Sequence, residues 1–543
     1  NTIGTKNIAV GSYALDTNTE GDRNVAIGYQ ALDANTTADD NVAIGNQASK
    51  CTSSGTCNIA IGTDARRDGT TGCCNIAIGF QALRESETAN NNIAIGHEAL
   101  QQNTSGANNV AIGGLSLDAN TTGDNNIAMG RGALGANTEG NCNVAIGDLA
   151  LVASTTANQN TGIGMLSMTA TTSGIRNTAL GRQSMCANTT GCCNVAVGSN
   201  SLASGTTGDF NVAVGGAALG SINTGNCNVA VGACAMNTNT SGAVNVAIGK
   251  DALIANTTGS ENIAIGFLSG STNTSGAGNT FVGREAGKGN TTADHNTAVG
   301  YFALKIASTG CCNTAMGYNA LGNMTTTCCN TAIGQSTGTS VTTGIANTMI
   351  GSRAGCTVTT GDRSVFVGEA TGSHGTGLTT GDNNTYVGYA IQPSAADVHC
   401  ELVINARGNS STGKGTRTGF IHVDNGVFQG NNSSSWSTTS DRRIKKNIVD
   451  NTTGLDKINQ IQVRNFEYRK EEEITDFEKP EAAVIKKEGV QVGVIAQEIE
   501  TILPDLVKVE STGVKTVDSS NLTWYLVNAI KELKAEIDEL KKG

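Results

Sequence analysis

A pentapeptide of the approximate form Asn-[Ile/Val/Thr]-Ala-[Ile/Val]-Gly returns every seventeen residues along most of this 543-residue chain. Counting Asn as position 0, the frame starts at Asn7 and runs without an insertion or deletion, and Ser364 replaces the Asn at the last position in register. The Gly at position 4 is present in all twenty-two units, from Gly11 to Gly368. One further unit begins at Asn384, twenty residues after Ser364. A fixed short period predicts a stacked structural repeat and argues against a globular enzyme domain.

Each unit has room for two short strands and two turns, whereas a helix pair does not fit. The unit that starts at Asn24 has an alternating run, then a small apolar pair at Ala31 and Leu32, then a polar turn. β-branched side chains at positions 1 and 3 share one face of the strand, and Ala at position 2 points to the other face. Both faces are apolar, so one fills the coil and the other needs a partner. Because small Ala side chains permit a neighbouring chain to approach closely, we expect oligomerisation along the whole shaft.

The repeated Gly and Asn predict the corners of the coil. Gly suits a corner where φ is positive or where backbone packs against backbone. Asn suits the opposite corner, because it tolerates the left-handed region and hydrogen-bonds its own turn. Stacked once per coil, the Asn side chains could also form a ladder along the fibre. From the sequence alone, both interpretations of the Asn, turn former and ladder, stay open.

Composition limits what the shaft can do. Only 4% of residues are aromatic and 70 are Gly, so burial comes from a thin apolar line repeated many times. The formal net charge of -11 argues against a nucleic-acid partner. No apolar run approaches the roughly eighteen residues that cross a bilayer, so we expect no membrane insertion. We expect no cofactor and no metal, and Asn1 lies inside a partial repeat, which predicts a region upstream.

The 16 cysteines follow the repeat, since most lie one or two positions before the repeat Asn. Several are one period apart, which brings their Cα atoms within disulfide range in adjacent coils and predicts a disulfide ladder. The pairs are Cys57 with Cys74, Cys311 with Cys328, and Cys312 with Cys329. Staples within one turn, such as Cys51 with Cys57, and small reduced side chains are the alternatives. A zinc site is not indicated, because the chain has no CxxC pair and only 5 His.

The organisation changes near Pro393, the first proline of the chain. We assign residues 1–391 to the repeat shaft and residues 392–439 to a Ser/Gly/Asn-rich neck, whose short apolar runs could pair between chains. Residues 440–543 hold 17 basic and 20 acidic residues, against 18 and 26 in the much longer preceding part. This shift in charge predicts a separate, ordinary globular domain.

Four separated blocks in that domain resemble a known family. They are Ser440-Asp-Arg-Arg-Ile-Lys-Lys-Asn-Ile448, Val463-Arg-Asn-Phe-Glu-Tyr468, Gly493-Val-Ile-Ala-Gln-Glu-Ile499 and Leu503-Pro-Asp-Leu-Val507. In this order they resemble the intramolecular chaperone domain of phage tailspikes and fibres, peptidase family S74. The resemblance implies a trimeric folding clamp that aligns three chains and then cuts itself off with a Ser-Lys dyad.

Mapped residue by residue, the resemblance makes Ser440 the nucleophile, Lys445 the base and Thr439-Ser440 the scissile peptide. A Lys serves as a base only when burial or nearby positive charge lowers its pKa, and Arg442 and Arg443 supply such charge. On spacing alone this basic segment reads as a solvated face, so the assignment depends on the resemblance. Self-cleavage is the one enzymatic activity we expect, with no turnover enzyme in the repeats.

The last segment, from about Leu522 to Lys542, predicts a helix. Its apolar residues alternate four and three apart, which is typical of a short coiled-coil seam that would serve trimerisation. The seam consists of Leu526, Ile530, Leu533, Ile537 and Leu540. Fewer than three heptads do not fix the number of helices, so the trimer rests on the family resemblance. The alternative is an amphipathic helix that packs on its own domain.

The repeats themselves resemble the left-handed parallel β-roll of YadA-type trimeric adhesin heads, which carry a similar Val-Ala-Ile-Gly motif in a usually shorter unit. We therefore expect a mainly β protein. It would have a trimeric β-roll or β-solenoid shaft, a β-rich neck and a small α+β terminal chaperone domain that ends in a coiled-coil helix.

Together these features predict a homotrimeric viral fibre, of a bacteriophage, that serves host attachment as an extracellular virion appendage and assembles in the host cytoplasm. Its expected partners are copies of itself, other virion tail proteins and a host-cell surface receptor, with a glycan as one candidate. Near-identical coils let a chain slip by a whole repeat, so a terminal trimeriser is needed to set register. The alternatives are a cell-surface trimeric adhesin and a glycan-degrading tailspike, although the repeat carboxylates form no evident catalytic pair.

Overall fold

The computed structural model describes residues 2–222, 224–406, 408–423, 442–475, 485, 487–509 and 513–542. The chain divides into two compact units, Asn1–Ser352 and Arg353–Gly543. The first unit is a β-solenoid, as the period predicted. The second contains further coils and a small α/β domain.

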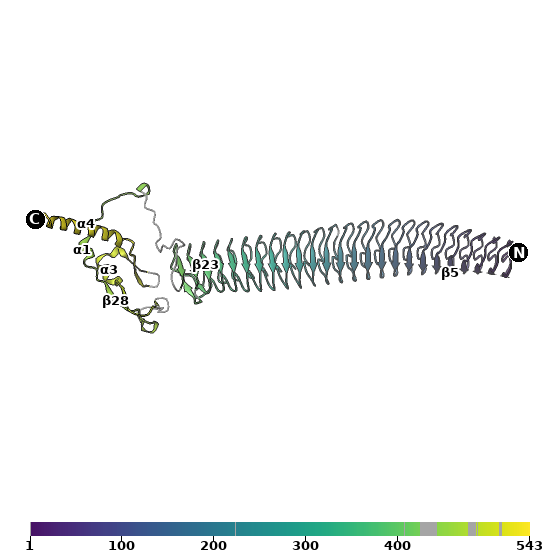
Figure 1. Ribbon diagram of the computed structural model, residues 1–543. Helices are drawn as coiled ribbons and strands as arrows, with labels where there is room; N and C mark the ends of the chain where they lie inside the picture. Colours follow the sequence, from purple (N-terminus) through teal and green to yellow (C-terminus); the bar gives the residue numbers. More distant parts are fainter. Residues whose placement is uncertain are drawn as a thin grey trace. The chain divides into compact units, whose positions relative to one another are not determined.

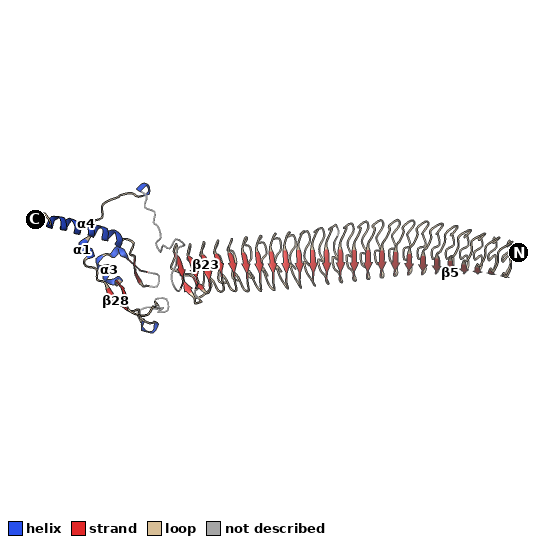
Figure 2. Cartoon of the chain, in the orientation of Figure 1, coloured by secondary structure: helices blue, strands red, loops and turns tan. Residues whose placement is uncertain are grey.

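The described part of the first unit has one strand of three residues in each coil. Each strand pairs in parallel with the strand of the next coil at the same repeat position, as Val25 pairs with Val42. The strands lie in one row along one side of the coils (Figures 1 and 2). They are β1 (Ile8–Val10), β2 (Val25–Ile27), β3 (Val42–Ile44), β4 (Ile59–Ile61), β5 (Ile76–Ile78), β6 (Ile93–Ile95), β7 (Val110–Ile112), β8 (Ile127–Met129), β9 (Val144–Ile146), β10 (Thr161–Ile163), β11 (Thr178–Leu180), β12 (Val195–Val197), β13 (Val212–Val214), β14 (Val229–Val231), β15 (Val246–Ile248), β16 (Ile263–Ile265), β17 (Thr280–Val282), β18 (Thr297–Val299), β19 (Thr314–Met316), β20 (Thr331–Ile333) and β21 (Thr348–Ile350).

The expectation of two strands per coil was wrong. Opposite the strand, Gln30 and Leu32 have φ angles of 53° and 50°, in the left-handed region, which interrupts any extended run. The backbone still bonds between coils there. The Gln30 amide donates to the Ser12 carbonyl at 3.0 Å, and the Leu32 amide donates to the Ala48 carbonyl at 3.1 Å. The far side of the coil is therefore hydrogen-bonded to its neighbours without forming a second strand.

The interior of the coil is lined by Ala and Leu. Ala26 in β2 and the pair Ala31 and Leu32 are fully buried, whereas Val25 is half-buried and Ile27 is exposed. We had expected the Ala face to meet a neighbouring chain, and this orientation was wrong. A seventeen-residue coil is too narrow to hold β-branched side chains opposite Leu, so Ala fills the inside at close-packed density. The β-branched face consequently points outward.

The repeat Gly occupies a corner that other residues cannot. Gly113 has a φ of +132°, and a Cβ atom placed on it would lie 2.7 Å from the carbonyl oxygen of Gly130 in the next coil. Both reasons considered for this Gly, positive φ and backbone packed on backbone, therefore hold at the same corner.

The repeat Asn side chains form a ladder, which decides between the two interpretations. The Asn24 amide donates to Asn7 Oδ1 at 2.8 Å, and the Asn41 amide donates to Asn24 Oδ1 at 3.0 Å. Asn24 Nδ2 also donates to the Ala38 carbonyl at 2.8 Å. We had expected the Asn itself to adopt the left-handed conformation at this corner. The residue before it does so instead, such as Arg23 with φ 56°. The Asn is thus required for its side chain and not for its backbone conformation.

A second, unanticipated Asn ladder runs inside the coils at position 11. Asn35 Nδ2 donates to Asn18 Oδ1 at 2.6 Å, and Asn120 Nδ2 donates to Asn103 Oδ1 at 2.7 Å. These amides are buried, so each would carry a desolvation penalty if it were left unpaired. Where Asn occupies position 11 in successive coils, the ladder pairs each Nδ2 group with the preceding Oδ1 and links the coils, whereas the last Oδ1 of a run, such as that of Asn35, has no hydrogen-bond partner among the described residues.

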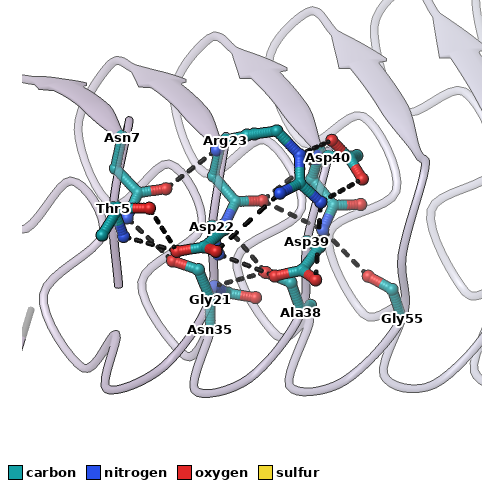
Figure 3. Close-up of polar contacts among 12 residues, drawn as sticks. Thr5, Asn7, Gly21, Asp22, Arg23, Asn35, Ala38, Asp39, Asp40 and Gly55 are labelled. Atoms are coloured by element: carbon teal, nitrogen blue, oxygen red, sulfur yellow. Dashed lines mark hydrogen bonds and ion pairs between the residues drawn. The ribbon is translucent and has the colours of Figure 1, made fainter. Parts of the chain in front are cut away.

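Polar side chains also join the coils at the outer edge, just before the repeat Asn (Figure 3). Asp22 Oδ1 accepts from Thr5 Oγ1 at 2.9 Å, and the Asp22 amide donates to Asp39 Oδ1 at 2.7 Å. Arg23 Nε donates to Asp40 Oδ1 at 2.6 Å. This hydrogen bond from Arg23 lowers the pKa of Asp40. The outer edge is therefore held from coil to coil by side chains as well as by the backbone.

Large residues inside the coil are matched by glycines. Phe281 replaces Ala at position 2 and is fully buried. Position 8 of the same coil is Gly287 in place of Leu, and a Cβ atom there would lie 2.3 Å from the Phe281 ring. In the preceding coil Gly270 also replaces Leu at position 8, and a Cβ atom on it would lie 2.8 Å from the Phe281 ring. The ring thus occupies the volume that two Leu side chains would otherwise fill.

Arg66 is an exception of a different kind, because it is a fully buried cation at the Leu position of its coil. Its Nη1 donates to Thr52 Oγ1 at 2.7 Å and its Nη2 donates to the Gly72 carbonyl at 2.6 Å. Burial lowers the pKa of Arg66 to about 10. The guanidinium fills the place of the missing position-11 Asn, which is Gly69 here; a Cβ atom on Gly69 would lie 2.6 Å from Arg66 Cζ.

In the second unit, four strands pair with one another in parallel, in the order β22 (Val365–Val367), β23 (Thr385–Gly388), β25 (Leu402–Asn405) and β27 (Gly419–His422). The twenty-residue step between β22 and β23 leaves the pairing in register. Strands β25 and β27 are the apolar runs of the predicted neck. We had considered that they pair between chains, but they pair within this chain, because the seventeen-residue spacing resumes after β23.

The remaining described elements follow in chain order. They are β24 (Ile391–Gln392), β26 (Ser411–Thr412), η1 (Arg442–Ile444), α1 (Leu455–Ile458), β28 (Arg464–Phe466), η2 (Glu471–Glu473), β29 (Gln491–Gly493), α3 (Ala496–Ile502), η3 (Pro504–Leu506), β30 (Val507–Val509), β31 (Lys515–Val517) and α4 (Leu522–Leu540). Strands β24 and β26 are parallel, whereas β28 with β29 and β30 with β31 form antiparallel pairs. The predicted terminal helix is present as α4.

Candidate functional site

The terminal domain has its own small core. Ile499 comes from α3, Leu503 lies between α3 and η3, Leu506 comes from η3, and Tyr525 comes from α4. The Tyr525 hydroxyl donates to the Asp505 carboxylate, and this hydrogen bond raises the pKa of Tyr525. One face of α4 is thereby fixed to the rest of the domain.

The predicted cleavage residues fall at the edge of the described structure. Thr439 and Ser440 lie outside the described residues, so the Ser-Lys dyad stays a prediction. Lys445 is exposed and follows η1, with its backbone amide donating to the Arg442 carbonyl at 3.3 Å. Arg442 and Arg443 are also exposed. The segment is therefore basic and open to solvent around the predicted base.

A neighbouring side of α4 carries the predicted seam. Its five members are all exposed: Leu526, Ile530, Leu533, Ile537 and Leu540. The helix is held by polar contacts elsewhere, since Asn528 Nδ2 donates to the Asn451 carbonyl at 2.9 Å and Glu532 Oε2 accepts from the Leu455 amide at 2.5 Å. The sequence left two alternatives for this helix, a coiled-coil seam and an amphipathic helix that packs on its own domain. The structure shows features of both, because one face packs on the domain and the apolar seam is exposed.

A longer apolar surface lies on the shaft. We call the side chains at positions 1 and 3 of strands β1 to β21 the outer row; all of them are Ile, Val, Thr, Leu or Met. Those most exposed beyond the first coil are Ile27, Ile44, Ile61, Ile127, Met129, Leu180, Ile248, Ile263, Ile265, Met316, Ile333 and Ile350. An exposed apolar surface of this extent marks an interaction site. Sequence reasoning found this row but placed it inside the coil.

All 16 cysteines are free thiols in the structure. Cys57, Cys74, Cys312 and Cys329 are exposed at the left-handed position before the repeat Asn. A hydrogen bond with the neighbouring Cys329 sulfur raises the pKa of the Cys328 thiol to about 11. A protonated thiol is a poor nucleophile at neutral pH. The disulfide ladder stays a prediction that requires an oxidant.

Two further searches concern metals and membranes. Within the described ranges, no group of three or more His, Cys, Asp or Glu side chains is placed to hold a metal ion. Among the described helices, none is both long and apolar enough to span a bilayer.

Comparison with known proteins identifies the terminal part of the chain. Residues 440–508 match the Peptidase_S74 family model, described as chaperone of endosialidase. The Long tail fiber protein Gp37 of Enterobacteria phage M1 is 37% identical over 106 residues, which is 19% of this chain. Gp37 of Enterobacteria phage Ox2 matches with the same identity over the same length.

The match covers 38% of the length of each tail-fibre relative. The predicted resemblance is confirmed: the chain carries a chaperone-of-endosialidase domain at its C-terminal end, and over 106 residues it is similar to phage long tail-fibre proteins. The β-solenoid precedes this domain in the chain.

Proposed function

We propose that the chain is a homotrimeric phage tail-fibre shaft for host attachment, located on the virion. Its partners are two further copies of itself, other virion tail proteins and a receptor on the host surface. The observation that carries the proposal is the similarity of the C-terminal part to long tail-fibre proteins, joined to a β-solenoid.

The outer row and the α4 seam support self-association. Both are mainly apolar surfaces that a single chain leaves in water, and other copies of the chain would cover them. The number three rests on the family resemblance of the terminal domain. In this arrangement the coils keep Ala and Leu inside, and the outer rows of the copies face one another.

The terminal domain would set the register of the three chains. Every coil of the first unit repeats the same strand pairing, so a shift by seventeen residues preserves nearly all contacts. A domain that associates first removes this degeneracy. Cleavage of the Thr439-Ser440 peptide by Ser440, with Lys445 as base, would then leave a trimer that is stable for kinetic reasons.

Cleavage is tested by expressing the intact chain and Ser440→Ala side by side on a denaturing gel. We expect two fragments from the intact chain and one full-length band of about 55 kDa from Ser440→Ala. Ser437→Ala serves as the control and should still be cut. Continued cleavage of Ser440→Ala would show that the assignment is wrong.

Self-association is tested by light scattering on Ile265→Lys, which places a charge in the outer row. Ser275→Lys adds the same charge at an exposed turn of the same coil. We expect the first variant to lose or weaken the trimer and the second to retain it. Equal behaviour of the two variants would argue against the outer row as the interface.

Attachment is tested by competition. Purified chain in excess should reduce adsorption of the parent particle to its host, whereas the isolated terminal fragment should not. Release of oligosaccharides from host glycans would instead favour the glycan-degrading tailspike.

A further inference from the structure

Position 5, directly after the repeat Gly, carries large polar and aromatic side chains in five consecutive coils. They are Lys250, Phe267, Arg284, Tyr301 and Tyr318. The strands that precede them, β15 to β19, pair in register, so these side chains stack one per coil on the surface of the shaft. We call this column the position-5 ladder.

The members of the ladder contact one another in sequence. Lys250 Nζ lies 6.0 Å from the centre of the Phe267 ring, and Arg284 Cζ lies 5.5 Å from the same ring. Arg284 is also 5.6 Å from the Tyr301 ring. The rings of Tyr301 and Tyr318 are stacked, with centres 5.6 Å apart and planes at 14°. Each member of the ladder thus contacts the next, either as a cation over a ring or as two stacked rings. These contacts limit the freedom of the long side chains before any ligand binds.

The ladder is open to solvent. The exposed fractions of Phe267, Tyr301 and Tyr318 are 37%, 37% and 49%, and that of the Arg284 side chain is 56%. Rings that are held in place yet exposed over this much of their surface can contact a second molecule with little loss of side-chain entropy.

The charge next to the ladder is positive. Glu285 has only 9% of its side chain exposed, and three cations surround its carboxylate: Lys288 at 3.1 Å, Arg284 at 3.6 Å and Lys305 at 4.0 Å. Lys305 also lies 3.9 Å from the ring of Phe302. One carboxylate cannot neutralise three cations, so the surface around Glu285 carries a local excess of positive charge. At the start of the ladder, Lys250 is paired with Asp251 at 3.8 Å.

We propose that the position-5 ladder binds an acidic glycan, a linear polysaccharide whose sugars carry carboxylate or phosphate groups. The proposal rests on the host-attachment function and names the chemical class of the receptor. Rings at Phe267, Tyr301 and Tyr318 would contact the C–H faces of successive sugars. The fork of Arg284 would bind carboxylate or phosphate oxygens through two hydrogen bonds, with Lys305 and Lys288 adding charge.

The axial spacing favours this occupant. Adjacent coils are roughly 4.8 Å apart, which is comparable to the length of one sugar ring. A polymer that advances one sugar per coil would therefore meet an equivalent position at every step. Stacked rings and cations also fit single-stranded nucleic acid, and oligothymidylate is therefore one of the probes in the test.

The test measures binding of the full chain to four immobilised probes: polygalacturonate, a lipopolysaccharide with a phosphorylated core, dextran and oligothymidylate. Binding to the first alone identifies sugar carboxylates, and binding to the second alone identifies sugar phosphates. We expect one or both to bind and dextran to fail. Tighter binding of oligothymidylate, or no binding to either acidic glycan, would overturn the proposal.

The variants are Tyr318→Ala, at the exposed end of the ladder, and Arg284→Ala. Each should weaken binding to the acidic probe by about tenfold, the loss expected for one stacked ring or one charge-assisted contact. Phe80→Ala is the matched control, since Phe80 occupies the same repeat position with 43% of its surface exposed, beside His97 and without flanking Lys or Arg in its stack. Equal losses for Phe80→Ala and Tyr318→Ala would refute the assignment.

Two measurements separate this proposal from the attachment function. If Tyr318→Ala blocks particle adsorption as well as the unchanged chain does, the ladder is not the receptor site, whereas the attachment function stands. If the chain binds the acidic probe without blocking adsorption, the ladder stands and attachment fails. A variant that loses its oligomeric state by light scattering would show that the ladder is an interface between chains, which also overturns the proposal.

Discussion

Two adjacent glycines allow a direct test of why the repeat Gly is present in every coil. Gly113 is the repeat Gly of its coil, with φ +132°, and Gly114 follows it with an unstrained backbone. A Cβ atom would lie 2.7 Å from the Gly130 carbonyl oxygen in the first case and 3.9 Å from the His97 carbonyl oxygen in the second. Ala at the two sites adds the same atom to the same coil in very different surroundings.

The magnitude follows from two terms. Forcing an L-residue into this region of φ costs about 1–3 kcal/mol, and relieving the contact with the next coil costs about 1–3 kcal/mol more. We therefore expect Gly113→Ala to lower the free energy of local opening by about 2–6 kcal/mol. Gly114→Ala should change it by less than about 1 kcal/mol, and in the stabilising direction, because Ala restricts the unfolded chain.

Amide hydrogen exchange followed by mass spectrometry measures this locally, which matters because a stack of coils does not unfold as one unit. Peptides that cover Val110 to Gly130 should exchange at least about thirtyfold faster in Gly113→Ala. Peptides several coils away serve as the internal reference. If both variants exchange alike, neither the φ angle nor the backbone contact explains the repeat Gly, and the reasoning fails.

Three further outcomes are expected. Phe281→Ala leaves a cavity and should weaken its coil by about 3–5 kcal/mol, read as faster exchange of the coil peptides; no change would mean that the neighbouring coils collapse into the space. Gly69→Asn alone should weaken its coil by about 1–3 kcal/mol through the contact with Arg66, whereas the double variant with Arg66→Leu should recover or exceed the original protection. The Asp148 pKa is lowered chiefly by its hydrogen bond from Arg131, so this contact stabilises the coil above the ordinary Asp pKa of about 3.9 and is lost as pH falls below it. Asp148→Asn should therefore accelerate exchange at pH 6 relative to the intact chain, and the difference should vanish in acid.

The sequence predicted the coil and its register because the spacing of Asn and Gly is a direct consequence of stacking. It did not predict which face lies inside. Alternation along Val25, Ala26 and Ile27 separates two faces without ranking them, and only the width of the folded coil excludes the larger side chains. The second strand was predicted because an Ala-Leu pair reads as extended, whereas Leu32 adopts a left-handed conformation that its residue type rarely takes.

The candidate sites divide in a similar way. Helix α4 was predictable from its spacing, and its exposed seam follows from that pattern. Of the predicted dyad, Lys445 lies within the described residues and Ser440 lies outside them, so the dyad stays a prediction. The sequence analysis did not predict the position-5 ladder, because it considered the pattern within each coil and not the same position in successive coils. Aligning the units in columns places Arg284 between Phe267 and Tyr301, and this was the signal available in the sequence.

The stacking of the coils also determines how the first unit bears load. Hydrogen bonds between coils run along the stacking direction, so tension in that direction acts on every junction with the same force. Additional coils increase reach and total extension but add no strength. The unit yields at its weakest junction, and the candidates are the coils in which another residue replaces the position-11 Asn, as at Gly69, Ser154, Gly205 and Ala307. A long and uniform shaft can thus have a breaking force that its weakest junction alone determines.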